Sequence, residues 1–377
     1  MRYLVFFIVA SIVMGLSHRY VWARLVRDAD LPAPWNKVAT GAIIVMFVLL
    51  MTSFFLVRLL HRPLAAPLMW TTYSWLGLLF FLVMTLGLSD AAKAITLRVQ
   101  GSGTIDDPGR RTAISRLFAG GAALLGVGAA SVGVANVLAP VAVKRVRVEL
   151  SKLKTSGAKI VQLTDVHVGP TIGREYIERV VKRVNDLDAD VVVITGDLVD
   201  GSVDELKEHV APLGTMKNKH GIFFVTGNHE YYSGAEAWCR YLESIGIKVL
   251  RNEHVRIGGG DGFDLAGIDD PSSGTQDLRK ALAHRDPEIA CVLLAHQPRG
   301  IHLAEELGVD LQLSGHTHGG QLFPWNYMVR LQQPFIAGLH KLQTAQIYVS
   351  SGTGYWGPPM RVGTSAEITE IVLVAKA

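Results

Sequence analysis

Side chains of the kinds that bind divalent metals follow five apolar runs between residues 159 and 314 of this 377-residue chain. Each run ends at an Asp, Asn or His, and in two places a further candidate follows two positions later. Carboxylate, amide and imidazole groups are the protein ligands that divalent metals use. The candidate ligands, in chain order, are Asp165, His167, Asp197, Asn228, His296, His316 and His318.

Asp197 is the centre of this set. It follows residues 191–194, four β-branched apolar residues typical of a strand that is buried on both faces of a parallel sheet. Ligands bind at the carboxyl ends of the strands in open α/β sheets. Buried carboxylates and imidazoles are strongly penalised unless a cation lies between them. We therefore expect the seven side chains to meet at one edge of one sheet, around metal.

The number of candidates predicts two ions. In Asp165-x-His167 and His316-x-His318 the two ligands of each pair should point the same way, as they do on an extended chain. Seven ligands are too many for one ion that keeps open positions. They suit two divalent ions that share a bridging carboxylate and lie about 3.5–4 Å apart. Mixed nitrogen and oxygen ligation suits manganese, zinc or iron.

The elements that must position these residues begin near residue 144. Strands are expected at residues 147–150, 159–164, 191–194, 222–226, 291–295 and 311–313, with others near 248–250, 264–267, 346–350 and 368–374. Apolar residues at helical spacing predict an amphipathic helix at 174–187 and a second helix at 206–213, with further helices near 235–244, 276–283 and 300–307. The chain from residue 144 is therefore predicted to be an α/β domain that begins βαβα and finishes in β.

The motifs, taken in order, resemble the calcineurin-like metallophosphoesterases. The resemblance rests on Asp165-x-His167, Gly196-Asp197, Gly227-Asn228-His229-Glu230, His296, and Gly-His-Thr-His-Gly-Gly-Gln at residues 315–321, and it covers residues 158–375. The strings at 196–200, 315–321 and 354–359 are similar to a membrane-attached bacterial branch of that superfamily. The fold that the resemblance implies is a four-layer αββα sandwich of two sheets flanked by helices.

The resemblance also implies roles for individual residues. Asp165, His167, Asp197 and His318 would hold one metal ion, Asp197, Asn228, His296 and His316 would hold the second, and His229 would be catalytic. The implied activity is hydrolysis of a phosphoester or pyrophosphate bond by a hydroxide that bridges the two ions. His229 would give a proton to the leaving oxygen or hydrogen-bond the transition state, and Glu230 would fix a ligand in place.

Three further points stay open. Arg361 would either contact a substrate phosphate or lie solvated on the surface. Bacterial relatives include enzymes that cleave UDP-2,3-diacylglucosamine, so that a lipid-linked phosphate is the expected kind of substrate. A non-catalytic metal-binding sensor or scaffold in the membrane is the alternative function.

The first 143 residues are expected to be a membrane anchor. The chain is 49% hydrophobic with a mean hydropathy of +0.27, and its net charge of +4 is too mild for a nucleic-acid-binding protein. Four apolar segments lie at residues 3–16, 38–57, 64–88 and 117–143, with a polar linker at 101–116. A membrane span needs about 20 apolar residues, so the short first segment could instead be a cleaved signal peptide.

These segments predict the complete organisation. An N-terminal α-helical transmembrane bundle, residues 1–143, is followed by the catalytic α/β domain, residues 144–377, in a bacterial inner membrane. No segment carries a charge in mid-span, which excludes an obvious ion pathway.

The distribution of Lys and Arg predicts the orientation. The loops after the first and third segments carry nine: Arg19, Arg24, Arg27, Lys37, Lys93, Arg98, Arg110, Arg111 and Arg116. The other side carries three, Arg2, Arg58 and Arg62, before the basic residues that begin the long domain are counted. The more positive side should be cytoplasmic, so the catalytic domain is expected on the extracytoplasmic side.

Overall fold

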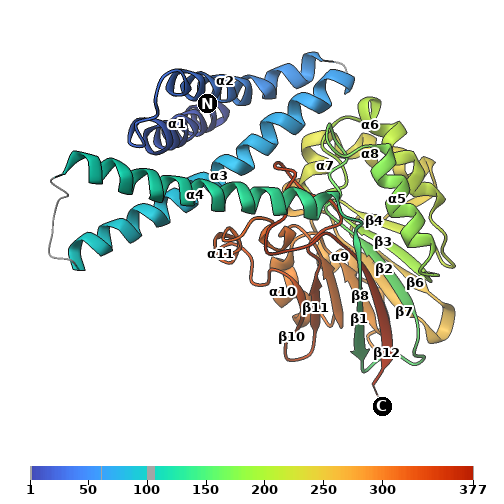
Figure 1. Ribbon diagram of the computed structural model, residues 1–377. Coiled ribbons are helices and arrows are strands. Elements are labelled where there is room, and N and C mark those ends of the chain that lie inside the picture. Colours follow the sequence, from blue (N-terminus) through green and yellow to red (C-terminus); the bar gives the residue numbers. More distant parts are fainter. Residues whose placement is uncertain (1, 61, 100–106, 377) are drawn as a thin grey trace. The chain divides into compact units, whose positions relative to one another are not determined.

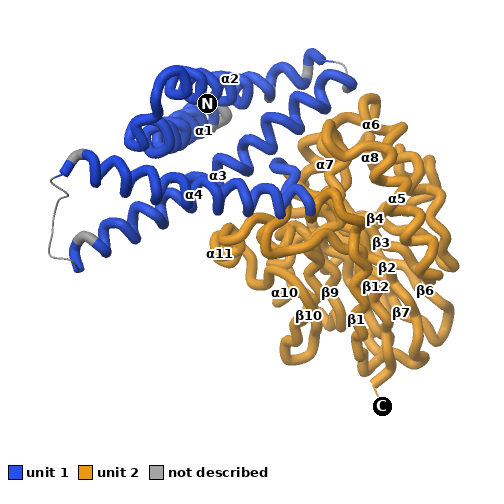
Figure 2. Tube along the Cα trace, in the orientation of Figure 1, with its two compact units in different colours: residues 1–135, 357–360 blue, residues 136–356, 361–377 orange. Residues whose placement is uncertain are grey.

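The computed structural model describes residues 2–60, 62–99 and 107–376 and separates into two compact units (Figures 1 and 2). The helical unit contains residues 1–135 and 357–360, and the α/β unit contains residues 136–356 and 361–377. The expected division into functional domains at residue 143 stays a prediction.

The helical unit is built from long apolar helices. Its main helices are α1 (Arg2–Trp22), α2 (Trp35–Leu59), α3 (Arg62–Val99) and α4 (Pro108–Leu138), and α1 continues into a short π-helix, Ala23–Arg27. Within the described residues, three stretches are long and apolar enough to cross a membrane: Trp35–Ser53, Pro63–Thr96 and Gly109–Leu138. The expected bundle of apolar helices is thus confirmed for three segments. The first segment is helical but is not among the three, so its crossing of a membrane stays a prediction.

The expected linker is only partly testable. Residues 101–106 lie outside the described residues, whereas α4 begins at Pro108, so the second half of the expected linker is helical. Small residues let α4 approach α3 closely, because a Cβ on Gly126 would come within 3.1 Å of Leu82 Cδ2.

The α/β unit contains two six-stranded sheets. Their strand orders are β1-β12-β2-β3-β4-β5 and β10-β11-β9-β8-β7-β6. The strands of the first sheet are β1 (Ala142–Leu150), β12 (Glu367–Ala375), β2 (Lys159–Leu163), β3 (Val191–Thr195), β4 (Ile222–Val225) and β5 (Ile247–Val249). Those of the second are β10 (Gly338–Lys341), β11 (Gln346–Val349), β9 (Leu311–Ser314), β8 (Cys291–Leu294), β7 (Phe263–Gly267) and β6 (Glu253–Ile257).

Alternating side chains of each strand enter different layers of the core. In β3, Val191 and Val193 belong to the core between the two sheets, which also contains Leu294 of β8. Val192 and Ile194 instead pack among the helices that cover the first sheet. Those helices are α5 (Arg174–Asn185), α6 (Val203–Val210) and α8 (Ala235–Ser244), while α9 (Leu278–Ala281) and α10 (Ile301–Glu306) pack on the second sheet. The four-layer αββα sandwich is therefore confirmed.

Parallel pairing gives each sheet a common carboxyl edge. In the first sheet β2, β3, β4 and β5 run parallel, and in the second β7, β8, β9 and β11 do. Strands β6 and β10 lie at edges and were not expected, because their sequences lack an apolar run.

Candidate metal centre

The seven predicted ligands follow strands, as expected, but the strands belong to two sheets and not to one. Asp165 and His167 follow β2, Asp197 follows β3, Asn228 begins α7 (Asn228–Ser233) after β4, His296 follows β8, and His316 and His318 follow β9. The expectation of a single sheet edge is wrong because alternation of strands and helices does not reveal that the chain changes sheets after β5. Side chains from both sheets nevertheless meet in one place.

The backbone at these ligands is left-handed. Asp165, His167, Asp197, His316 and His318 have φ values of 50°, 54°, 50°, 71° and 51°. The expectation that the paired ligands lie on extended chain is therefore wrong. Such values are uncommon for residues other than glycine, cost on the order of 1–3 kcal/mol each, and gather at functional sites. Five of them around one site mean that the loops are held in strained shapes that aim side chains inward.

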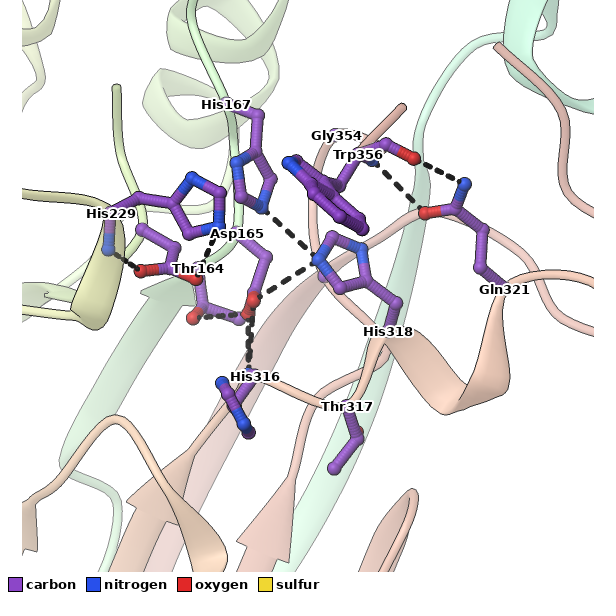
Figure 3. A network of polar contacts seen from close by, with 12 residues as sticks. Thr164, Asp165, His167, His229, His316, Thr317, His318, Gln321, Gly354 and Trp356 are labelled. Carbon is purple, nitrogen blue, oxygen red and sulfur yellow. Dashed lines mark hydrogen bonds and ion pairs between the residues drawn. The ribbon is translucent and has the colours of Figure 1, made fainter. Parts of the chain in front are cut away.

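One group of ligand atoms is formed by Asp165, His167 and His318 (Figure 3). His318 Nε2 lies 3.1 Å from His167 Nε2 and 3.4 Å from Asp165 Oδ1. His167 Nδ1 lies 3.1 Å from Asp200 Oδ1, which accepts its hydrogen bond, so Nε2 is the ring nitrogen left to bind a metal. Thr164 Oγ1 and the backbone N–H of His316 donate to the Asp165 carboxylate.

The second group is formed by Asp197, His296 and His316. His296 Nε2 lies 3.0 Å from Asp197 Oδ2 and 3.2 Å from His316 Nδ1. His296 Nδ1 donates to the carbonyl oxygen of Thr195 at 2.8 Å, so Nε2 is the ring nitrogen left to bind a metal. Each group thus presents nitrogen and oxygen atoms that converge on one another.

The buried amide of Asn228 tests whether a metal fits this place. Among the described residues, Asn228 Oδ1 is buried and has no hydrogen-bond partner. A buried oxygen without a partner costs about 1–3 kcal/mol, and a cation would remove that cost. The donor set of imidazoles, carboxylates and one amide oxygen also matches divalent transition metals. The residues present therefore fit a metal.

Electrostatics separates the four imidazoles into two pairs. Burial lowers the pKa of His318 well below its usual value and, helped by repulsion from His296, lowers that of His316 to about 3, so both are neutral. Burial also lowers the pKa of His167, but Asp200 outweighs it and raises the value to about 9. The pKa of His296 is likewise raised to about 10, because Asp197 outweighs burial. A metal would therefore displace protons from the second pair, and its affinity should rise with pH.

The structure adds Asp200, for which no role was predicted. Asp200 Oδ1 accepts from His167 Nδ1 at 3.1 Å and from His229 Nδ1 at 2.6 Å. Burial raises the pKa of Asp200, but the two imidazoles outweigh burial and hold the pKa well below the usual value, so Asp200 is ionised. The sequence signal for Asp200 was a carboxylate three residues after Asp197. Its loop is positioned by a β-bridge between Val168 and Val199, which the sequence does not reveal.

Glu230 and two glycines hold the Asp197 and Asp165 loops. The Glu230 carboxylate accepts from the backbone N–H groups of Asp197, Leu198 and Gly227 at 3.0, 2.8 and 2.6 Å, so it fixes a ligand as expected. A Cβ on Gly227 would overlap Asp197 Oδ1. A Cβ on Gly315 would overlap Asp165 Oδ2, so both positions require glycine.

Arg361 is neither on the surface nor directed at a substrate, and both expectations for it are wrong. It is fully buried, and its guanidinium donates to the carbonyl oxygens of Gly354, Ser351 and His318. It forms no ion pair with a carboxylate of any described residue, and burial lowers its pKa to about 10. Its contacts join the loop that carries His318 to the loop after β11.

Arg361→Met is expected to destabilise the fold. Removing the guanidinium takes the donors from the buried carbonyl oxygens of Gly354 and Ser351 and one of the two donors from that of His318, at a cost on the order of 3 kcal/mol. That cost corresponds to a fall in melting temperature of about 6–12 °C for a domain of this size, measurable by thermal denaturation of the detergent-solubilised chain. Arg240→Met, at an exposed position, is the matched control. Equal melting temperatures in the two variants would contradict the role given to Arg361.

His229 stands beside both groups without belonging to the predicted ligands. Its Nε2 lies 3.9 Å from Asp197 Oδ2, while its backbone N–H donates to Asp197 Oδ1 at 2.9 Å. Two exposed aromatic rings flank it, those of Tyr232 and Trp356, with centroids 5.5 and 5.7 Å from the imidazole. Tyr355, in contrast, is buried.

Residues 158–320 match the protein family described as calcineurin-like phosphoesterase. A bovine "Transmembrane protein with metallophosphoesterase domain" is 43% identical over 65% of this chain and 60% of its own length. An "Uncharacterized metallophosphoesterase" of Helicobacter pylori is 42% identical over 62% of this chain and 64% of its own length. The match thus spans less than two thirds of these relatives.

A third relative matches from end to end. The "Uncharacterized metallophosphoesterase" of Campylobacter jejuni is 33% identical over the whole of both chains. The aligned region includes the helical unit as well as both groups of ligand atoms. This chain belongs to the calcineurin-like metallophosphoesterases.

Proposed function

We propose that the protein is a membrane-anchored phosphoesterase with two divalent metal ions. The observation that supports this most strongly is the pair of convergent groups around Asp165 and Asp197, with His229 beside them. We assign Asp165, His167, Asp197 and His318 to one ion and Asp197, Asn228, His296 and His316 to the other. We assign Asp197 to both ions because its Oδ2 lies 3.0 Å from His296 Nε2 of the second group, while its charge also helps to raise the pKa of His167 in the first.

Phosphoester hydrolysis needs separate groups to neutralise the phosphoryl charge, to protonate the leaving oxygen and to contact the leaving group. Two divalent ions, when bound, neutralise phosphoryl charge and lower the pKa of water. Asp200 holds His229 through Nδ1, so that Nε2 faces the centre and can donate a proton to the leaving oxygen. The rings of Tyr232 and Trp356 border the same imidazole and would contact the group that leaves.

For the substrate we propose a phosphoester carried by a lipid. The apolar helices supply attachment to a membrane, and the exposed rings beside His229 suit a leaving group with apolar surface. A nucleotide-lipid such as UDP-2,3-diacylglucosamine is one such substrate. It is cytoplasmic, so the predicted extracytoplasmic orientation argues for another lipid phosphate.

Metal removal and replacement tests the activity. The chain purified in detergent should contain about two manganese, zinc or iron ions by elemental analysis and should hydrolyse bis(p-nitrophenyl) phosphate. Treatment with a chelator should abolish turnover, and one of the three metals should restore it. Two bound ions without turnover on monoesters, diesters, pyrophosphates or lipid phosphates would instead favour the sensor or scaffold.

The orientation is tested by fusions after Ala377. With nine basic residues on one side and three on the other, we propose that the α/β unit lies outside the cytoplasm of a bacterium. An alkaline phosphatase fusion should then be active and a green fluorescent protein fusion dark. The reverse pair would place the centre in the cytoplasm and make a nucleotide-lipid substrate plausible again.

A further inference from the structure

An exposed apolar surface lies immediately after the His318 loop. We call residues 322–332 the apolar segment; it contains the short helix α11 (Asn326–Val329). Its large exposed side chains are Phe323, Trp325, Tyr327, Met328 and Leu331, and Leu331 is 78% exposed. Arg330 is its only charged residue, and it contains no acidic residue. Exposed apolar surface of this extent marks an interaction site.

Close packing and backbone hydrogen bonds hold the apolar segment against the rest of the α/β unit. Gly320, with φ of 86°, lets Asn326 pack where a Cβ would overlap it. Leu322 forms a β-bridge with Val362, and Phe323 N–H donates to the Val362 carbonyl oxygen at 2.9 Å. The exposed rings are therefore presented outward by an ordered loop.

The same residues hold the end of a candidate membrane span. Asn136 lies near the end of α4, and its side-chain Nδ2 donates to the carbonyl oxygen of Arg361 at 2.9 Å. Arg361 directly precedes Val362. Val137 packs against Ile172 and Tyr355. These contacts lie within the α/β unit. The end of α4 is bound to Arg361 and the start of the apolar segment to Val362, so the two are fixed to adjacent residues.

The length of α4 limits how far this place lies from the bilayer. The candidate span Gly109–Leu138 has 30 residues, and about 20 cross the hydrocarbon core. At 1.5 Å per residue, the remaining residues extend the helix by no more than about 15 Å. That distance is comparable to the headgroup layer, which lies within reach of side chains anchored beside Val362.

We propose that the apolar segment rests in the interface of the bilayer that α4 crosses, so that the α/β unit is bound to lipid by its own surface. Trp and Tyr favour this interface, and Arg330 would meet anionic headgroups there. The proposal does not depend on hydrolytic activity. A second copy of the chain, or its own helical unit, is the competing occupant of this surface.

Quenching by brominated lipids tests the contact. Met328→Cys in the full chain is labelled with a fluorophore and placed in vesicles of phosphatidylcholine and phosphatidylglycerol; Cys239 and Cys291 are buried, so the unmutated chain is the labelling blank. Bromine on the acyl chains should reduce the fluorescence about twofold, as for interfacial side chains. Glu253→Cys, exposed on edge strand β6, should be unaffected. Leu331→Cys should behave like Met328→Cys and guards against a folding defect in one variant.

Several results would overturn the proposal. Equal quenching at positions 328 and 253 would show no specific contact. Labels at 328 and 331 that are unquenched in vesicles and equally shielded in detergent would mean that the chain's own helices cover the segment. Shielding that increases with protein concentration, without quenching, would mean that a second copy covers it.

Discussion

Asp197→Asn is expected to abolish phosphoester hydrolysis and to deplete both metal ions. The Asp197 carboxylate belongs to the second group of ligand atoms, with Oδ2 3.0 Å from His296 Nε2, and its charge also helps to raise the pKa of His167 in the first group. Burial raises its pKa, but His296 and His229 outweigh burial and hold the pKa well below the usual value, so it enters the site as an anion. An amide keeps the shape but removes the charge and points two N–H donors at cations.

Elemental analysis and turnover of the purified variant check this expectation. The metal content should fall from about two ions per chain to well below one, and hydrolysis should fall to the background rate. Asp204→Asn, exposed on α6, should change neither quantity. Two ions and near-normal turnover in Asp197→Asn would show that the carboxylate is not shared.

The strands that carry the site were predictable because they are buried on both faces. Such strands have continuous apolar runs, and the run at residues 191–194 coincides with β3 to within one residue. Each run is then followed by a polar residue whose burial is unfavourable unless a partner such as a metal ion compensates it. Five of the seven ligand candidates followed from that contrast, and His167 and His318 from the positions two residues later. Six of the seven form the two groups of ligand atoms, and Asn228 directly precedes His229, whose N–H donates to Asp197.

The arrangement of the loops could not be predicted, because it depends on contacts between distant residues. Nothing local shows that His296 and His318 come from a second sheet, or that five ligands adopt positive φ. Asp200 was missed because its partners are His167 and His229, which lie about thirty residues away. Edge strands β6 and β10 were missed because partial exposure removes the apolar pattern.

Arg361 shows the same limit for a charged residue. A sequence gives an arginine two ordinary environments, solvent or an anion, and this one has neither. Its burial depends on three carbonyl groups from two loops, the one that carries His318 and the one after β11, which are available only because those loops come together. Burial of this kind is decided by tertiary structure and leaves no local signal.

His229→Ala is expected to lower turnover without removing metal. The imidazole contacts Asp200, the His167 ring and the two aromatic rings, and Nε2 stays 3.9 Å from Asp197 Oδ2, outside the two groups assigned to metal. Turnover should fall by about 10²–10⁴, the usual contribution of a positioned general acid. The metal content should remain at about two ions per chain, because none of the assigned ligands is lost.

The leaving group distinguishes proton donation from a structural role for His229. p-Nitrophenolate leaves readily without a proton, whereas an alkyl alkoxide does not, so His229→Ala should impair alkyl phosphoesters much more than bis(p-nitrophenyl) phosphate. Side-by-side kinetics on the two kinds of ester measure this, with His302→Ala, exposed on α10, as the control. Equal losses on both esters would remove the acid role. Loss of an ion would instead place His229 among the ligands, together with His167 and Asp200, whose ligand atoms already lie within 4.8 Å of one another.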